Sequence, residues 1–210
     1  MSAAVILVYI TVLSGFFPVL AAAWNYRRLD PVLKLVAIFC LLAAIPDPVG
    51  LLVHFKNSIF LIHLYDLMAV VFFTLIYYKA FNKVIFKKIT LALGGLSLLV
   101  VICNALFIEG LLVYPSISNT VLSLLMIPLS LGYFYELLTR QEFVHIEKQG
   151  MFWINAGVLF YFSILIFLFM LFNKISHAEQ NDYYMMQSVT NIIANLLYSV
   201  GLLCKPQKTT

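Results

Sequence analysis

The sequence predicts an all-α membrane protein that folds as a bundle of seven transmembrane helices. Seven apolar stretches have the length, about 20 residues, that crosses a bilayer, and basic residues are concentrated in every second connection between them. The composition agrees, because 63% of the residues are hydrophobic and 10% are charged, whereas about a quarter of a soluble domain is charged. Since these stretches use most of the 210 residues, we expect one membrane-embedded domain over residues 1–210.

The apolar stretches are predicted to be helices, because a segment in lipid must satisfy its own backbone hydrogen bonds. A membrane barrel would need alternating apolar and polar residues, and residues 160–172 are apolar on both alternating sets. The first stretch lacks the basic segment of a cleavable signal peptide, so we expect it to be retained. The predicted spans cover about residues 3–24, 31–54, 58–78, 89–108, 117–138, 151–172 and 182–204.

The orientation follows from the distribution of lysine and arginine. The first, third and fifth connections and the C-terminal tail hold 11 of these 13 residues, and only Lys56 and Lys174 fall on the other side. Because basic connections stay in the cytoplasm, we expect the N-terminus outside and the C-terminus inside a cell membrane. The net charge of +4 therefore indicates orientation and not nucleic-acid binding. The 11 residues are Arg27, Arg28, Lys34, Lys79, Lys83, Lys87, Lys88, Arg140, Lys148, Lys205 and Lys208.

The second span contains two prolines and a glycine within residues 46–50, which must kink or break a helix. One interpretation is a plain kink, or an early end of the helix near the membrane surface. The other is a discontinuous helix that lines a cavity, as in transporters. The sequence leaves both interpretations open.

Polar side chains recur at helical spacing inside two spans. The third span carries His63, Asp66, Thr74 and Tyr77 on one stripe. The seventh span repeats the rhythm. Its stripe consists of Tyr184, Gln187, Asn191, Asn195 and Tyr198. Because lipid cannot satisfy these groups, we expect both stripes to face the interior of the bundle.

Two sets of polar residues are distinguished by their depth in the membrane. We expect the outer set to bind a ligand in an outward-opening pocket between the second, third, fifth and seventh spans. It consists of Asp47, His63, Asp66, Asn104, Asn119, Gln187 and Asn191. The alternative is that His63, like His54 and Glu109, reaches interfacial water. We expect the inner set to join helices by hydrogen bonds of about 0.6 to 2 kcal/mol each. It consists of Tyr77, Tyr133, Glu136, Asn155, Asn195 and Tyr198.

The sequence predicts no catalytic residues, no metal and no cofactor. The acids and histidines come from different spans and their spacing does not make them converge, and neither a zincin motif nor a nucleophile elbow occurs. Cys40, Cys103 and Cys204 show no disulfide or zinc spacing and are interpreted as small buried side chains. A retinal pigment would need a lysine in the membrane core, and the seventh span has none before Lys205.

Three segments carry a resemblance to a known family: residues 63–66 (His-Leu-Tyr-Asp) with the tyrosine pair 77–78, residues 133–138 with 152–157, and residues 190–195 (Thr-Asn-Ile-Ile-Ala-Asn). Over the third to seventh spans the chain resembles an uncharacterised family of small bacterial seven-helix membrane proteins. This resemblance implies the same helix assignment and the bacterial inner membrane. No activity is attached to it.

A weaker similarity concerns topology. The third and seventh spans share their polar rhythm at an offset of 121 residues, and the first and fifth spans each contain a proline, Pro18 and Pro128. This is similar to the three-plus-one-plus-three parallel repeats of SWEET sugar transporters. The chain departs from that family because a proline–glutamine pair occurs only in the tail and the sixth span has no proline.

We therefore expect a receptor-like or sensory membrane protein that binds a small or amphipathic ligand from the outer side. It would pass a change to a cytoplasmic or membrane signalling partner, with the bilayer as its other partner. The first alternative is a transporter for a small polar solute, and the second is a lipid-modifying membrane enzyme.

Overall fold

The computed structural model describes residues 3–46, 48–49, 59–139, 145–171 and 180–204. In these ranges every regular element is a helix and no strand occurs, which confirms the all-α prediction. The long helices are α1 (Ala3–Asn25), α2 (Pro31–Ala43), α4 (Ile59–Ala80), α5 (Val84–Cys103), α6 (Ser116–Leu138), α7 (Gly150–Leu171) and α8 (Gln180–Leu203). Short turns of helix lie at η1 (Tyr26–Arg28), η3 (Asn104–Ile108) and η4 (Ile146–Lys148).

Six helices of the described chain are long and apolar enough to cross a membrane. They are the long helices α1, α4, α5, α6, α7 and α8, and α2 is shorter. Each has an apolar window of the length that the hydrocarbon layer requires. Together with the composition, they indicate a membrane-embedded protein.

α2 begins with two signals that the sequence contains. Pro31 occupies its first turn, and the Asp30 carboxylate accepts the backbone N–H groups of Val32 and Leu33, both at 2.8 Å. The helix ends at Ala43, and a turn at Ala44 and Ile45 precedes Pro46, which cannot donate a backbone hydrogen bond. The second predicted span reached residue 54, and most of its last part lies outside the described residues.

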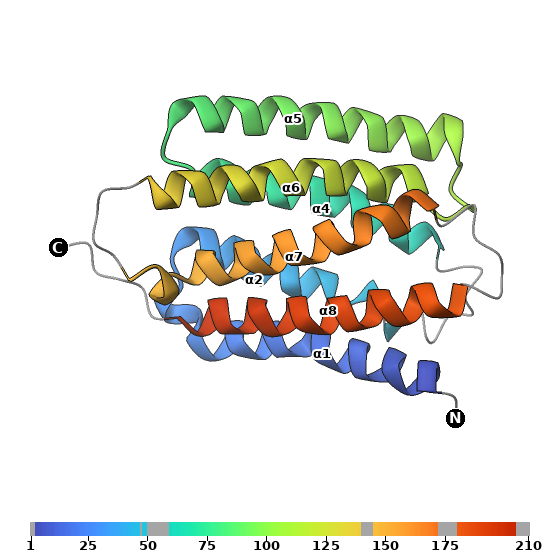
Figure 1. The fold of residues 1–210 in the computed structure, drawn as a ribbon, viewed down its shortest axis with the longest axis horizontal. Helices are drawn as coiled ribbons and strands as arrows, with labels where there is room; N and C mark the ends of the chain where they lie inside the picture. The colour runs from blue at the N-terminus through green and yellow to red at the C-terminus, as the bar shows by residue number, and fades with distance from the viewer. Residues whose placement is uncertain (1–2, 47, 50–58, 140–144, 172–179, 205–210) are drawn as a thin grey trace.

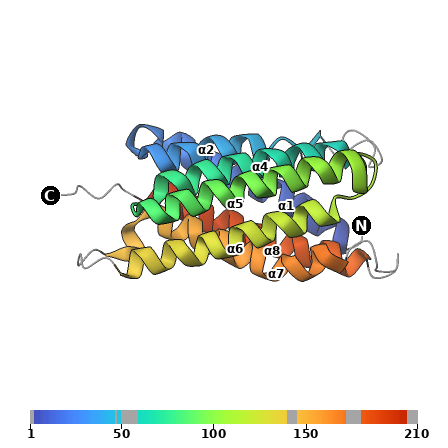
Figure 2. The ribbon, with the colours of Figure 1, turned by 90° about the horizontal axis from the view of Figure 1, so that it is seen from above.

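The helices run along the long axis of the molecule (Figure 1), and the contacts of all the long helices except α5 close into a ring. Following their contacts, α1 packs on α2, α2 on α4, α4 on α6, α6 on α7, α7 on α8, and α8 returns to α1. α5 lies outside this ring against α4 and α6, at the top of Figure 1. Seen from above, α2, α4 and α5 form one side of the bundle, and α6, α7 and α8 form the other (Figure 2).

Glycine allows close approach of two helix pairs. A Cβ atom on Gly94 of α5 would overlap the Thr74 side chain of α4. Between α7 and α8, a Cβ on Gly201 would lie 2.7 Å from the carbonyl oxygen of Gly150. Small residues at such crossings let helix backbones pack closely in lipid, where van der Waals contact drives association.

We therefore predict that Gly201→Ala destabilises the protein, because α7 and α8 must move apart to admit the methyl group. The expected loss is about 1 to 3 kcal/mol, as for other overpacked sites. Gly95→Ala is the matched control, because a Cβ at Gly95 meets nothing within 4 Å and alanine is the better helix former. Thermal unfolding in detergent should show a lower midpoint for Gly201→Ala only. Equal midpoints for the two variants would contradict the close packing.

Candidate ligand-binding cavity

A cavity of about 210 Å³ lies inside the ring of helices. All six ring helices contribute to its wall, and α5 contributes none of the lining residues. A single water molecule needs a cavity of only about 10–15 Å³ on this kind of measure, so there is room for a small organic molecule. The apolar part of the wall includes Val12, Phe39, Ala43, Ile62, Phe73 and Phe162.

The polar part of the wall consists of amides and phenols. The amides are Asn119, Gln187, Asn191 and Asn195, and the phenols are Tyr65, Tyr114, Tyr161 and Tyr198. The lining contains no carboxylate, imidazole, ammonium or guanidinium group within the described part of the chain. Such a wall can exchange hydrogen bonds with a neutral polar molecule but supplies no countercharge for an ion.

α8 contributes more polar groups to the cavity than any other helix. Gln187, Asn191, Asn195 and Tyr198 follow one another at intervals of four, four and three residues, so that one face of the helix presents all of them. The Asn195 amide nitrogen donates to the Asn191 side-chain oxygen at 3.1 Å and to the Ser14 hydroxyl of α1 at 3.0 Å. These bonds use the Asn195 nitrogen and the Asn191 side-chain oxygen. Within this pair of amides, the Asn191 nitrogen and the Asn195 oxygen are therefore the groups that can bind a ligand.

α1 leaves space for the cavity at Gly15, which has no side chain. Gly15 and Pro18 both line the cavity, and a Cβ atom on Gly15 would meet nothing within 4 Å. Position 15 is therefore the place where a larger side chain would fill the cavity without displacing a neighbour.

The predicted outer set of ligand-binding residues divides into two groups in the structure. Asn119, Gln187 and Asn191 line the cavity, together with Asn195 and Tyr198 of the predicted inner set. His63, Asp66 and Asn104 are buried but do not line it. Asp47 lies outside the described residues.

Asp66 is completely buried, and neither of its carboxylate oxygens has a hydrogen-bond partner among the described residues. The Glu109 carboxylate lies close enough to repel it electrostatically. Removing an ionised carboxylate from water without a donor or a countercharge is costly. Asp66 is therefore the least compensated polar side chain of the described interior.

The connection between α5 and α6 carries Glu109 and contacts α4 beside Asp66; Asp66 and Glu109 are together called the acidic region. His63 Nε2 lies 3.1 Å from the carbonyl oxygen of Val113. Because a carbonyl oxygen can only accept a hydrogen bond, His63 Nε2 is the donor. Asn104 opens the π-helical turn η3, and its amide nitrogen donates to Glu109 Oε2 at 2.6 Å and to the Ser118 hydroxyl at 2.9 Å. These three hydrogen bonds thus hold the connecting residues 104–115 against α4 and α6.

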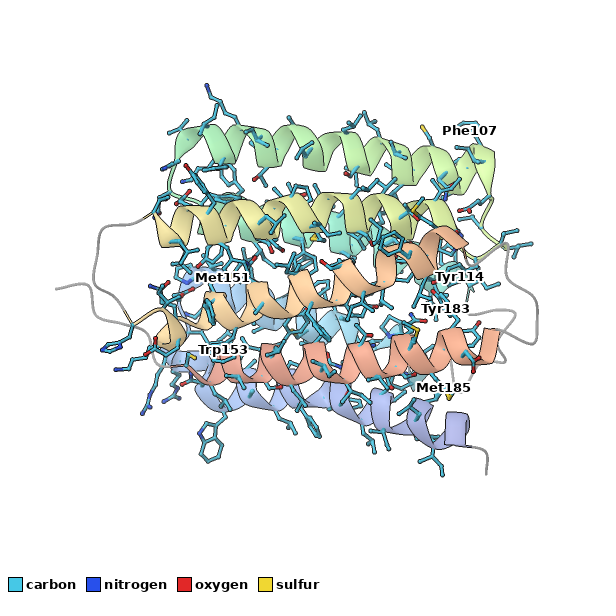
Figure 3. The ribbon with its side chains drawn as sticks, in the orientation of Figure 1. Phe107, Tyr114, Met151, Trp153, Tyr183 and Met185 are labelled. Carbon is cyan, nitrogen blue, oxygen red and sulfur yellow. The ribbon has the colours of Figure 1, made fainter. Side chains whose placement is uncertain are left out.

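Tyr114 stands between the acidic region and the cavity. It lines the cavity, its hydroxyl lies 2.9 Å from that of Tyr183, and it interacts electrostatically with Asp66. Figure 3 shows Tyr114 and Tyr183 together at the end of the bundle where α8 begins. Burial, and then the neighbouring Tyr183, hold the pKa of Tyr114 well above its usual value, so its hydroxyl keeps its proton and can donate.

Part of the predicted inner set forms a network next to the cavity. The Tyr77 hydroxyl donates to the Asn155 side-chain oxygen at 2.6 Å and lies 2.7 Å from the Ser130 hydroxyl. The Asn155 nitrogen donates to the Ser130 carbonyl oxygen at 3.1 Å, so the network joins α4, α6 and α7. Glu136 instead accepts the backbone N–H groups of Asn82 and Lys83 before α5. Tyr133 is buried with its ring 6.3 Å from that of Phe81.

Sequence reasoning did not assign the cavity residues of α1, nor Tyr65, Tyr114 and Tyr161, to the ligand site. With 12 tyrosines in the chain, a tyrosine in a span is a weak signal, and Gly15 gives none. No group of three or more histidine, cysteine, aspartate or glutamate side chains in the described ranges is placed to hold a metal ion.

We predict opposite effects on stability for the buried Asp66 and the half-buried Glu109. Asp66→Asn keeps the shape of the side chain and removes an acid whose ionised form has no partner in the described interior, so the variant should be at least as stable as the wild type. Glu109→Gln weakens a charge-assisted bond to Asn104 and contacts to the Ile117 N–H, and should cost about 1 kcal/mol. Thermal unfolding of both variants at neutral pH tests this, and a larger loss for Asp66→Asn would contradict it.

Comparison with models of protein families, with curated proteins and with solved structures finds no match. The resemblance to the small bacterial seven-helix family therefore stays a prediction.

Proposed function

We propose that this is a receptor-like integral membrane protein that binds a small, uncharged polar or amphipathic ligand in the cavity inside its helix ring. The single observation that carries the proposal is the composition of the cavity wall: amide and phenol groups on an otherwise apolar surface. Ligand sites generally combine apolar walls with a few polar groups that orient the ligand. A charged ligand would find no countercharge in the described wall.

The proposed orientation places the N-terminus outside and the C-terminus in the cytoplasm. Its support is the charge of the two ends of the bundle. Every described lysine and arginine belongs to the end where α1 meets α2, α4 meets α5 and α6 meets α7, at the left of Figure 1. Because Tyr114 belongs to the connection at the opposite end, we propose that the cavity opens to the outside there.

A ligand in this position touches all six helices of the ring, so it can stabilise one arrangement of them over another. It shifts such an equilibrium only by its difference in affinity for the two arrangements. The Phe73 ring on the cavity wall lies 6.5 Å from the Tyr77 ring, and Tyr77 belongs to the network with Ser130 and Asn155. This contact is our proposed route from the cavity toward a partner at the cytoplasmic end.

A transporter for a small polar solute is the second candidate, and the order of helix contacts favours it. α1, α2 and α4 pack in chain order, as do α6, α7 and α8, and the two rows close through α1 on α8 and α4 on α6. With α5 outside, this pattern is what two parallel three-helix repeats joined by one helix would form. For a lipid-modifying enzyme, no observation on the described residues provides similar support.

Filling the cavity should abolish binding. We predict that neutral sugars, polyols or nucleosides that raise the unfolding midpoint of the wild type do not raise that of Gly15→Leu. Gly95→Leu is the matched control, because both glycines lie within helices, and neither Cβ would meet a neighbour. Thermal-shift measurements on the three proteins provide the comparison. Binding that survives in Gly15→Leu, or stabilisation by charged compounds alone, would contradict the proposed site.

Flux measurements separate the two candidate functions. The flux assay uses, in radiolabelled form, a compound that stabilises the wild type in the thermal-shift measurements. For a receptor, liposomes that contain only this protein should take up no more of this compound than protein-free liposomes. Uptake that exceeds this background, and that Gly15→Leu abolishes while Gly95→Leu retains it, would replace the receptor with the transporter.

A further inference from the structure

Four lysines gather where α4 passes into α5. Lys79 lies in the last turn of α4, Lys83 directly precedes α5, and Lys87 and Lys88 lie in its first turns. We infer that this lysine cluster binds the phosphate group of an anionic phospholipid.

Two of the four ammonium groups are held over aromatic rings. Lys83 Nζ lies 5.7 Å from the centre of the Tyr135 ring of α6, and Lys87 Nζ lies 5.7 Å from that of the Tyr78 ring of α4. A cation over a ring face is attracted by the ring and loses part of its freedom. The lysine cluster is therefore a partly ordered arrangement across three helices, and its N–H groups remain able to donate to phosphate oxygens.

In the described part of the chain, no acidic side chain forms an ion pair with the ammonium groups of the lysine cluster. The described acids at this end of the bundle have other partners: Asp30 caps α2, Glu136 accepts the N–H groups of Asn82 and Lys83, and Glu147 lies 3.0 Å from His145. No ion pair joins the four lysines to another described residue. Glu136 supplies one negative charge beside four lysines, so the lysine cluster keeps an excess of positive charge that an anion from outside the chain can balance.

Helix stability does not explain these lysines. The first turns of a helix favour negative side chains, because the helix dipole is positive there. α5 has no acidic residue in its first turn, while Lys87 and Lys88 follow shortly after its start. A negative ligand at this position would turn an unfavourable arrangement into a favourable one.

The surface next to the lysine cluster favours a phospholipid over free phosphate. α5 lies outside the helix ring, and beside the lysines it exposes Val84, Ile85 and Ile89 to extents of 66%, 60% and 42%. Acyl chains can lie along these side chains while the phosphate meets the ammonium groups. Basic clusters at the end of membrane helices attract anionic lipids in this way.

The test compares nanodiscs of phosphatidylcholine with nanodiscs that also contain phosphatidylglycerol. We expect phosphatidylglycerol to raise the unfolding midpoint of the wild type by several degrees, and the double variant Lys83→Gln/Lys87→Gln to lose most of this rise. The control, Lys34→Gln/Lys148→Gln, removes two charges from the same end of the bundle, including a lysine 5.7 Å from the Tyr26 ring, and should keep the rise.

Three results would overturn the inference: no effect of phosphatidylglycerol on the wild type, an equal loss in both double variants, or the same rise on adding glycerol 1-phosphate to phosphatidylcholine nanodiscs. If the cluster variant does not fold, native mass spectrometry of the wild type decides. The protein should retain phosphatidylglycerol under conditions that remove phosphatidylcholine, and equal loss of both lipids would also overturn the inference.

Discussion

Hydrogen bonding without water is the constraint on which this structure depends. Lipid offers no donors or acceptors, so the backbone must form helices and the polar side chains must find partners inside the bundle. The network of Tyr77, Ser130 and Asn155 meets this requirement by joining three helices with short bonds. Where the side chains do not pair completely with one another, the structure contains either a cavity or an uncompensated group.

These two exceptions occupy different places. Amides and phenols line the cavity, where they can exchange hydrogen bonds with a ligand or water. Asp66 lies outside the cavity wall, near Glu109 and behind Tyr114, without a partner in the described residues. Its cost is one that selection on stability alone would remove, since an apolar residue of similar size is often more stable in such a position. This makes Asp66 a residue of functional interest beside the cavity and not inside it.

The sequence was sufficient to predict the helices and one face of the site. Lipid leaves the chain few alternatives, so length and hydropathy located the six long helices. For α2 the prolines indicated a kink or an interruption, but the predicted span continued to residue 54, whereas the helix ends at Ala43. The α8 stripe was informative for the same reason: its polar spacing identified Gln187, Asn191 and Asn195 as one inward face.

Helical periodicity, however, shows which residues share a face and not which neighbour that face meets. On α4 the stripe of His63 and Asp66 faces the segment that joins α5 and α6, while Ile62 and Tyr65, one position earlier, line the cavity. The contribution of α1 could not be predicted from the sequence either, because Gly15 contributes to the cavity wall only through the absence of a side chain. Both features depend on the order of the helices around the ring, which local sequence does not encode.

Access to Asn191 from the outside tests the central claim most directly. In a background in which Cys40, Cys103 and Cys204 are replaced by serine or alanine, single cysteines at position 191 and at position 66 would be exposed to a membrane-impermeant methanethiosulfonate reagent added outside right-side-out vesicles. Our account predicts modification of Asn191→Cys and protection of Asp66→Cys. Protection of Asn191→Cys, or faster modification of Asp66→Cys, would show that the cavity is not the outward-facing site.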